Sequence, residues 1–236
     1  MATDTDTVVQ GSTAPDFLTS GAGNDLLFGD GGNDVLNAGL GNDQLFGGSG
    51  TDVLDGGGGN DAIAGESGDD FLWSESGDNT LSGGDGQDTL YAGIGRDTLY
   101  GGNGADFLAS RADDDWVQGD DGNDFLDGDE GNDALFGDGS SGAYVGVADP
   151  SDPLNPDNQA GDSDSTDDDP IAIAPGVDPN LGNNDTIVAG AGQDTVYGGY
   201  GNDVLDGKAD DDFLSGDDGN DDIYGGAGND EIYGGS

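Results

Sequence analysis

The chain has 236 residues, of which 52 are acidic, three are basic and none is histidine, so its net charge is −49 at pH 7. This charge would repel nucleic acids and anionic membrane surfaces, so polyvalent cations or a basic partner are expected instead. The absence of cysteine excludes disulfides and thiolate metal sites. The N-terminal residues MATDTDTVVQ lack the basic and apolar regions of a secretory signal, and no apolar stretch approaches the ~18 residues of a membrane span.

Glycine occupies 50 positions, and glycine loses more conformational freedom on folding than any other residue. The aliphatic residues that could offset this loss are sparse. We therefore expect that the hydrophobic core alone does not hold the fold and that a bound ligand contributes.

Acidic residues recur at a strict interval of nine along two stretches of the chain. After an N-terminal segment 1–13, the first stretch (14–136) holds fourteen units and the second (182–236) holds six. We call the residues at this interval the ladder residues, and Leu, Ile or Val stands two residues after every one of them. A fixed short period of this kind predicts a solenoid. The ladder residues are Asp16, Asp25, Asp34, Asp43, Asp52, Asp61, Asp70, Asn79, Asp88, Asp97, Asp106, Asp115, Asp124, Asp133, Asp185, Asp194, Asp203, Asp212, Asp221 and Asp230.

Each unit divides into a turn of six residues and a strand of three. The six residues before Val53, GGSGTD, are turn-formers, because glycine adopts positive φ without steric cost. The next three favour a short strand, and its middle residue, always aliphatic, points inward. Two units close one coil of 18 residues. Alternate units therefore form two parallel sheets around a thin core.

Ladder residues one coil apart are expected to stack along the two edges of this solenoid. Asp34 lies over Asp52 on one edge, and Asp43 lies over Asp61 on the other. Carboxylates about 5 Å apart repel by ~1 kcal/mol per pair in water and by more near a protein surface. Bound cations would remove this repulsion, so metal sites are expected along both edges.

Segment 137–181 interrupts the ladder and differs in composition. It contains six of the seven prolines and the acidic run DSDSTDDD. An even number of units precedes it, and the ladder resumes in phase, so we favour a long loop inserted in one continuous solenoid over a hinge between two. The acidic run is not an EF-hand loop, because Thr166 and Asp167 stand where that loop needs Asp or Asn and then Gly.

The unit resembles the motif G-G-x-G-x-D-x-U-x of RTX (hemolysin-type) calcium-binding repeats. Clear examples are Gly47–Asp55, Gly101–Ala109, Gly198–Asp206 and Gly225–Tyr233. The resemblance implies an all-β fold, a right-handed parallel β-roll of about ten 18-residue coils, with Ca²⁺ held between stacked turns. It also implies multiple ions, roughly 12–18 at saturation. Mg²⁺, with its stricter octahedron, fits such turns poorly.

The resemblance implies that each ion takes oxygen ligands from two stacked turns. One turn gives the carbonyls of its second and fourth residues and its aspartate, and the next coil gives the carbonyls of its first and third residues and its aspartate. One site would thus use the carbonyls of Asp30 and Gly32 with Asp34, then Gly47, Ser49 and Asp52. Another would use Gly84, Gly86 and Asp88, then Gly101, Asn103 and Asp106. Further predicted carbonyl ligands are Gly29, Gly39, Gly41, Gly57, Gly59, Gly65, Ser67, Gly83, Gly119, Asp121, Gly198, Tyr200, Gly216 and Asp218.

Four departures from the motif are expected to affect particular sites. Asn79 has no carboxylate, so the sites it shares with Asp61 and Asp97 lose charge. Asp113 and Asp210 replace the second turn glycine, but aspartate tolerates left-handed backbone geometry, so the turn should survive. The first unit, STAPDFL, has no turn glycine and is expected to be a cap.

Outward positions on one sheet are expected to form an apolar ridge. Its row reads Phe17, Val35, Val53, Phe71, Thr89, Phe107, Phe125, Thr186 and Val204, and a sparser row on the other sheet reads Phe28, Phe46, Tyr100, Phe136, Tyr197 and Tyr233. A long exposed apolar patch usually marks an interaction site. The row could instead reflect β-propensity, or be covered by Tyr144–Ala148 and Ile171–Val177.

No catalytic constellation appears, because histidine and cysteine are absent and the carboxylates are spread along a ladder instead of converging. We expect a calcium-binding structural module that is unfolded at low calcium and folds outside the cell. In the family this switch serves type I export, whose signals follow the repeats, whereas this chain stops at YGGS. We therefore expect a piece of a longer protein or another export route. Alternatives are adhesion or self-assembly through the ridge, or glycan binding. Ice binding would need a denser threonine row.

Overall fold

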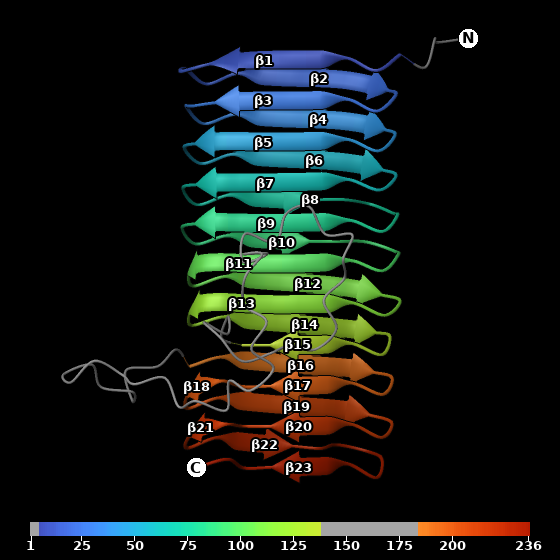
Figure 1. The fold of residues 1–236 in the computed structure, drawn as a ribbon, viewed down its shortest axis with the longest axis vertical. Helices are drawn as coiled ribbons and strands as arrows, with labels where there is room; N and C mark the ends of the chain where they lie inside the picture. The colour runs from blue at the N-terminus through green and yellow to red at the C-terminus, as the bar shows by residue number, and fades with distance from the viewer. Residues whose placement is uncertain (1–4, 138–183) are drawn as a thin grey trace, which may run out of the picture.

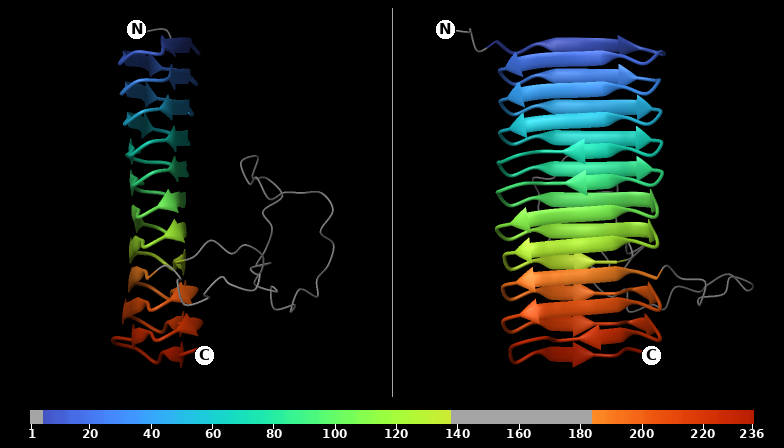
Figure 2. Two further views of the ribbon diagram at one scale, coloured as in Figure 1. Left: turned by 90° about the vertical axis from the view of Figure 1, so that its left-hand side faces the viewer. Right: turned by 180° about the vertical axis from the view of Figure 1, so that it is seen from behind.

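The computed structural model describes residues 5–137 and 184–236, and this part of the chain contains strands and turns but no helix. No segment of it is therefore a helix long and apolar enough to cross a membrane. The strands form two large parallel sheets that lie back to back (Figures 1 and 2). An additional short pair, β18 (Tyr200–Gly201) and β21 (Asp218–Gly219), extends one edge.

The first sheet faces the viewer in Figure 1 and has eleven described strands. They are β1 (Val8–Ser12), β3 (Leu26–Asp30), β5 (Gln44–Ser49), β7 (Ala62–Ser67), β9 (Thr80–Asp85), β11 (Thr98–Gly104), β13 (Trp116–Gly122), β15 (Ala134–Phe136), β17 (Thr195–Tyr197), β20 (Phe213–Ser215) and β23 (Glu231–Tyr233).

The second sheet lies behind it and has ten described strands. They are β2 (Phe17–Ala22), β4 (Val35–Leu40), β6 (Val53–Gly58), β8 (Phe71–Trp73), β10 (Thr89–Tyr91), β12 (Phe107–Ala112), β14 (Phe125–Glu130), β16 (Thr186–Ala191), β19 (Val204–Ala209) and β22 (Asp222–Tyr224).

The register follows the interval of 18 residues. Val35 pairs with Val53, and Val53 pairs with Phe71. The chain runs leftward through the front sheet, returns rightward through the back sheet and descends from the N-terminus (Figure 1), which is a right-handed path. The predicted parallel β-roll of about ten coils is therefore confirmed.

Each strand contributes one main inward-facing residue to the core between the sheets, as the alternation of inward and outward side chains predicts. Leu36 and Leu54 from the back sheet and Leu27 and Leu45 from the front sheet are completely buried. The same position of nearly every coil adds one such aliphatic residue, down to Leu214. The core is continuous but thin, so the turns at the two edges enclose a large share of the buried polar groups.

The roll continues across the interrupted segment without a change of register. Phe125 of β14 pairs with Thr186 of β16, and Ala134 of β15 pairs with Thr195 of β17. This continuity is what a loop inserted in a single roll requires. Most of segment 137–181 lies outside the described residues.

The first strand of the roll lies within segment 1–13. Val8 and Val9 of β1 pair with Leu26 and Leu27. Thr7 occupies the place of a ladder residue above Asp25, and both its backbone N–H and its hydroxyl donate to Asp25 Oδ1, at 2.7 and 2.9 Å. This half-coil therefore covers the top of the core without a ladder carboxylate of its own.

Candidate metal centres

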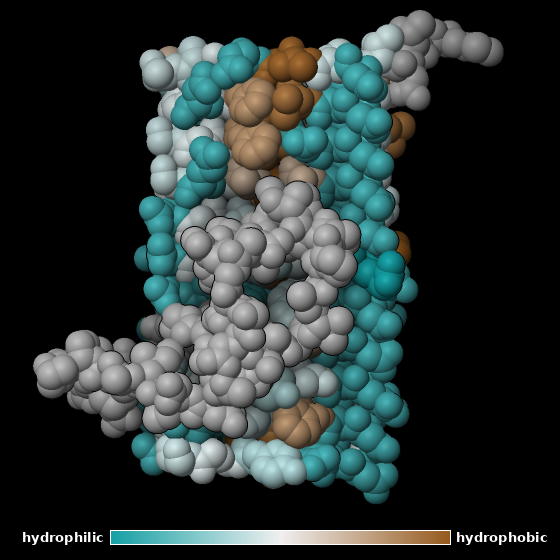
Figure 3. Space-filling view, in the orientation of Figure 1, coloured by the Kyte–Doolittle hydropathy of each residue, from teal (hydrophilic) through white to brown (hydrophobic). Residues whose placement is uncertain are grey.

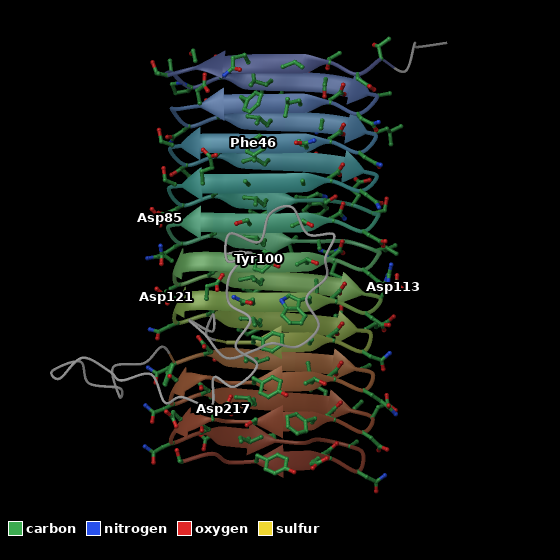
Figure 4. All side chains as sticks on the ribbon, viewed as in Figure 1. Phe46, Asp85, Tyr100, Asp113, Asp121 and Asp217 are labelled. Carbon is green, nitrogen blue, oxygen red and sulfur yellow. The ribbon has the colours of Figure 1, made fainter. Side chains whose placement is uncertain are left out.

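The turns form two columns, one along each edge of the roll (Figure 4). The left column, which includes the turns of Asp85, Asp121 and Asp217, carries Asp16, Asp34, Asp52, Asp70, Asp88, Asp106, Asp124, Asp185, Asp203 and Asp221. The right column, which includes Asp113, carries Asp25, Asp43, Asp61, Asn79, Asp97, Asp115, Asp133, Asp194, Asp212 and Asp230. We number the nine positions of a unit so that the ladder residue is position 6.

Positions 2 and 4 of most described turns adopt positive φ. All nine described non-glycine residues with positive φ fall on these two positions. They are Asp30, Glu66, Arg111, Asp120, Asp129, Lys208 and Asp217 at position 2, and Asp113 and Asp210 at position 4. The turns with Asp113 (φ 82°) and Asp210 (φ 83°) keep the geometry of the glycine turns, as predicted.

Carbonyl groups at positions 2 and 4 point at the next coil. A Cβ added to Gly50 would stand 1.7 Å from Gly32 O, and one added to Gly48 would stand 2.2 Å from Asp30 O. Both oxygens are among the ligands that the resemblance implies. The predicted ligands at position 3 already have one partner each, because Gly32 N–H donates to Ser49 O at 2.8 Å and Gly86 N–H donates to Asn103 O at 2.8 Å. A carbonyl oxygen has two lone pairs, so one remains for a cation.

One oxygen of nearly every ladder carboxylate joins successive coils. Asp52 Oδ1 accepts the backbone N–H of Asp34 at 2.7 Å, and Asp70 Oδ1 accepts that of Asp52 at 2.7 Å. The same bond links the ladder residues across the interruption, from Asp124 N–H to Asp185 Oδ1 at 2.7 Å. Most ladder residues are buried, whereas Asp16, Asp221 and Asp230 near the ends are partly exposed.

The second carboxylate oxygen is buried without a donor in most coils. This holds for Oδ2 of Asp25, Asp34, Asp43, Asp52, Asp70, Asp88, Asp106, Asp115, Asp133, Asp194, Asp212 and Asp221. A buried acceptor without a partner is costly, and a buried charge is more costly still. These oxygens therefore need a cation or a proton.

A second acceptor lies beside several of these oxygens. The space where a Cβ of Gly83 would stand is 2.4 Å from Asp88 Oδ2 and 2.6 Å from Gly101 O, and the corresponding space at Gly29 is 2.5 Å from Asp34 Oδ2 and 2.4 Å from Gly47 O. Only glycine fits there. No group of three acidic side chains gathers at a point among the described residues, so a cation would be held by carboxylates together with carbonyls. Such all-oxygen sites of adaptable geometry suit calcium.

Burial, opposed by the ladder hydrogen bond and reinforced by neighbouring carboxylates, raises the pKa of several ladder residues. The pKa rises from 3.8 to about 6 for Asp61 and Asp88, to about 7 for Asp70 and Asp115, and to about 8 for Asp133. Each group therefore keeps its proton to a higher pH in the cation-free roll than an exposed aspartate does. Where a carboxyl is protonated, calcium binding would have to displace the proton.

Acidification is therefore expected to stabilise the calcium-free roll. A carboxyl whose pKa is higher in the folded than in the unfolded chain contributes stability that is complete below pH ~3.8 and is lost as the pH rises through about 6 to 8. We expect calcium-depleted protein to gain β-sheet circular dichroism between pH 8 and pH 4. An unchanged coil spectrum over this range would contradict the expectation.

Two features of the columns were not predicted from the sequence. Asn or Asp at position 5 forms an outer ladder, as in Asn60 N–H to Asn42 Oδ1 at 2.9 Å and Asn202 N–H to Asn184 Oδ1 at 2.7 Å. The recurrence of Asn before the ladder residue was the available signal. The columns also differ at position 1, which is glycine in the described left turns but in the right column includes Ser20, Ala38, Ser74, Ala92, Ser110 and Ala189.

The predicted apolar ridge has the expected register, and most of its members are only partly exposed. Its members follow one another strand by strand on the back sheet, and Phe17, Val53 and Val204 are its exposed members. Phe107 and Phe125 stack at 5.0 Å with nearly parallel rings, so their faces contact each other and are not presented to a glycan. Thr80 and Thr98 pair on the front sheet, whereas Thr89 lies on the back sheet.

The front face carries the sparser row. Figure 3 shows apolar side chains gathered over the upper strands of this sheet, where Phe28 and Phe46 stack at 5.2 Å, between the hydrophilic turn columns. Tyr144–Ala148 and Ile171–Val177, which could cover the ridge, lie outside the described residues. Association through the ridge stays a prediction.

The model of the RTX calcium-binding nonapeptide repeat, which spans four copies, matches residues 2–36, 10–45, 37–72, 46–81, 73–108, 111–141, 181–214 and 207–236. These matches cover most of the chain and include both stretches of the ladder. No curated protein matches the chain.

Proposed function

Since the chain belongs to the family of RTX calcium-binding nonapeptide repeats, we propose that calcium bound between its stacked turns switches it from an unfolded chain to the roll. The module is structural and binds multiple calcium ions through its repeats. The finer proposal is that each ion takes the ladder carboxylates and turn carbonyls named above. The switch would operate where calcium is abundant, outside the cell.

The buried Oδ2 atoms without donors are the observation that supports this proposal. Asp34, Asp52, Asp70, Asp88 and Asp106 stack in one column, and each has such an oxygen. Without cations, folding would bring these charges together out of water at a cost that the thin core does not offset. A ligand that binds only the folded chain stabilises it by mass action, so calcium concentration sets the folded fraction.

The proposal is tested by adding calcium to the chelator-treated chain while following far-UV circular dichroism, with magnesium as the control. We expect a coil spectrum without calcium and a cooperative transition to β-sheet at or below about 1 mM, the range of extracellular calcium modules. Magnesium should not produce the transition. A full β-sheet spectrum in the chelator at pH 7.5 would overturn the proposal.

The same switch fits secretion of the parent protein. We propose that the chain stays unfolded at low intracellular calcium, passes a type I export channel in that state, and folds on reaching extracellular calcium. The acidic composition supports this, because net charge of one sign disfavours the compact state without counterions. Variants of this chain that fold without calcium should therefore block secretion of the parent protein.

A further inference from the structure

The right column contains one place where the buried polar groups are satisfied within the chain. Asn79 Nδ2 donates to Gly77 O at 2.8 Å, and this carbonyl is at position 4, where a calcium ligand is predicted. Above it, Ser74 Oγ donates to Asp61 Oδ2 at 3.1 Å. Below it, the backbone N–H of Gly93 donates to Asp97 Oδ2 at 3.4 Å.

These three contacts occupy oxygens equivalent to those proposed as calcium ligands in other coils. The Oδ2 atoms of Asp61 and Asp97 are absent from the set of buried oxygens without donors, whereas those of Asp43 and Asp115, one coil beyond, belong to it. The ladder bonds themselves persist, from Asp61 N–H to Asn79 Oδ1 at 2.9 Å and from Asn79 N–H to Asp97 Oδ1 at 2.7 Å. The coils around Asn79 are thus joined without a cation.

Basic residues reduce the charge of the same coils. Arg96 lies at position 5 beside Asp97, and its guanidinium contacts Asp78 at 3.4 Å while its backbone N–H donates to Asp78 Oδ1 at 3.0 Å. The ion pair is exposed and therefore weak. Arg96 and Arg111 are nevertheless two of only three basic residues in the chain, so this part of the right column carries less repulsion than the rest.

The back sheet carries an aromatic cluster over the same coils. Tyr91 lies 5.8 Å from Phe71, 6.2 Å from Trp73 and 5.5 Å from Phe107, measured between ring centroids. The guanidinium of Arg111 lies 5.5 Å from the Trp73 ring and 5.6 Å from the Tyr91 ring. Aromatic and cation–π contacts stabilise neighbouring strands without an ion, so β8, β10 and β12 are held together independently of calcium.

We propose that calcium does not bind in the two gaps between stacked turns that flank Asn79, one toward Asp61 and one toward Asp97. We also propose that the coils spanning Asp61 to Asp115 form a nucleus that orders at lower calcium than the rest of the roll. This inference rests on the proposed calcium-coupled folding and adds its order: the remaining coils assemble on a preformed template. A template removes the cost of starting a coil, which otherwise orders a turn and a strand before any inter-coil bond forms.

Trp73 reports on this nucleus directly. In a Trp116→Phe chain it is the sole tryptophan, so its emission can be followed beside far-UV circular dichroism during one calcium titration. We expect the Trp73 emission to shift to the blue at a calcium concentration about tenfold or more below the dichroism midpoint. Two coincident transitions would overturn the nucleus while leaving calcium-coupled folding intact. A calcium-independent β-sheet spectrum would instead overturn the proposed function.

Asn79→Asp tests the role of the amide. It restores a carboxylate and removes the donor to Gly77 O, so we expect bound calcium to rise by up to about two ions and the Trp73 transition to move toward the dichroism midpoint. The matched control is Asn60→Asp, which adds the same charge in the same column at position 5, where Oδ1 can still accept from Asp78 N–H. An unchanged Trp73 transition in Asn79→Asp would overturn the proposal, as would an equal shift in Asn60→Asp.

Arg111→Gln provides a second test if Asn79→Asp does not fold at saturating calcium. It removes the cation from the Trp73 and Tyr91 rings and leaves every ladder residue in place. We expect the separation between the two transitions to shrink by half or more, with the number of bound ions unchanged. A separation equal to that of the parent chain would contradict a nucleus built on this cluster.

Discussion

Gly50→Ala is expected to raise the calcium midpoint for folding by more than about tenfold. Gly50 is at position 4 with φ +139°, and an added Cβ would stand 1.7 Å from the carbonyl oxygen of Gly32. The strained backbone alone costs about 1–3 kcal/mol. The displaced carbonyl is also a proposed calcium ligand, so the variant loses binding energy together with folding energy.

Gly31→Ala is the matched control for Gly50→Ala. It changes a glycine in the same pair of stacked turns, but its φ is not in the positive range, and the nearest atom to an added Cβ is the movable Ser49 Oγ at 2.9 Å. We expect it to fold at nearly the parental calcium concentration. The comparison is made by calcium titration with circular dichroism. Equal midpoints for the two alanine variants would show that the position 4 carbonyls do not face a cation.

The fold could be predicted from the interval alone. A residue's place in the nine-residue unit fixes its strand, its direction and its partner 18 residues away, as Val35 pairing with Val53 shows. The same interval predicts that Leu36 and Leu45 are buried and that Asp34 stacks on Asp52, because each statement depends only on counting. The left-handed turn at Asp113 followed from the steric tolerance of aspartate.

The sites could be predicted less completely, because their differences depend on side-chain conformation. Asn79 donates to its own turn, and Ser74 donates to the carboxylate above. Both bonds require χ angles that the sequence does not specify. The stacking of Phe107 on Phe125 has the same origin. The strand β1 was not recognised because Thr7 stands where the later units carry Asp or Asn.

The two columns are not equivalent, which the motif by itself does not show. Position 1 of the right column carries Ser20 and Ser110, whose hydroxyls donate to the carbonyls of Ala38 at 2.9 Å and Gly128 at 3.3 Å. These donors compete with a cation for backbone oxygens. In the left column, glycine at position 1 leaves Asp88 Oδ2 and Gly101 O without such a neighbour. The left column should therefore bind calcium more strongly.

Asp70→Asn is the variant in which the dependence of stability on calcium bound in the left column should appear most clearly. Asp70 lies in the left column between Asp52 and Asp88, so its carboxylate serves two gaps. The asparagine Oδ1 can keep the ladder bond from Asp52 N–H, as Asn79 does for Asp61, while the buried charge at Oδ2 is lost. If each gap weakens about tenfold, the folded state loses about 3 kcal/mol at saturating calcium.

Asp69→Asn removes the same charge from the neighbouring residue and should have little effect. Asp69 is exposed at position 5, where asparagine is the common residue, and its Oδ1 accepts from Gln87 N–H at 2.9 Å, which asparagine can also do. Thermal unfolding in calcium and acid titration in chelator separate the two roles of Asp70. In calcium, Asp70→Asn should unfold at a lower temperature than Asp69→Asn. In chelator, Asp70→Asn should gain β-sheet circular dichroism at a higher pH than Asp69→Asn on acidification, because the residue at position 70, where burial raises the carboxyl pKa to about 7, no longer has to be protonated before the roll forms. Equal behaviour of the two variants would mean that total charge, and not the buried ladder, couples this roll to calcium.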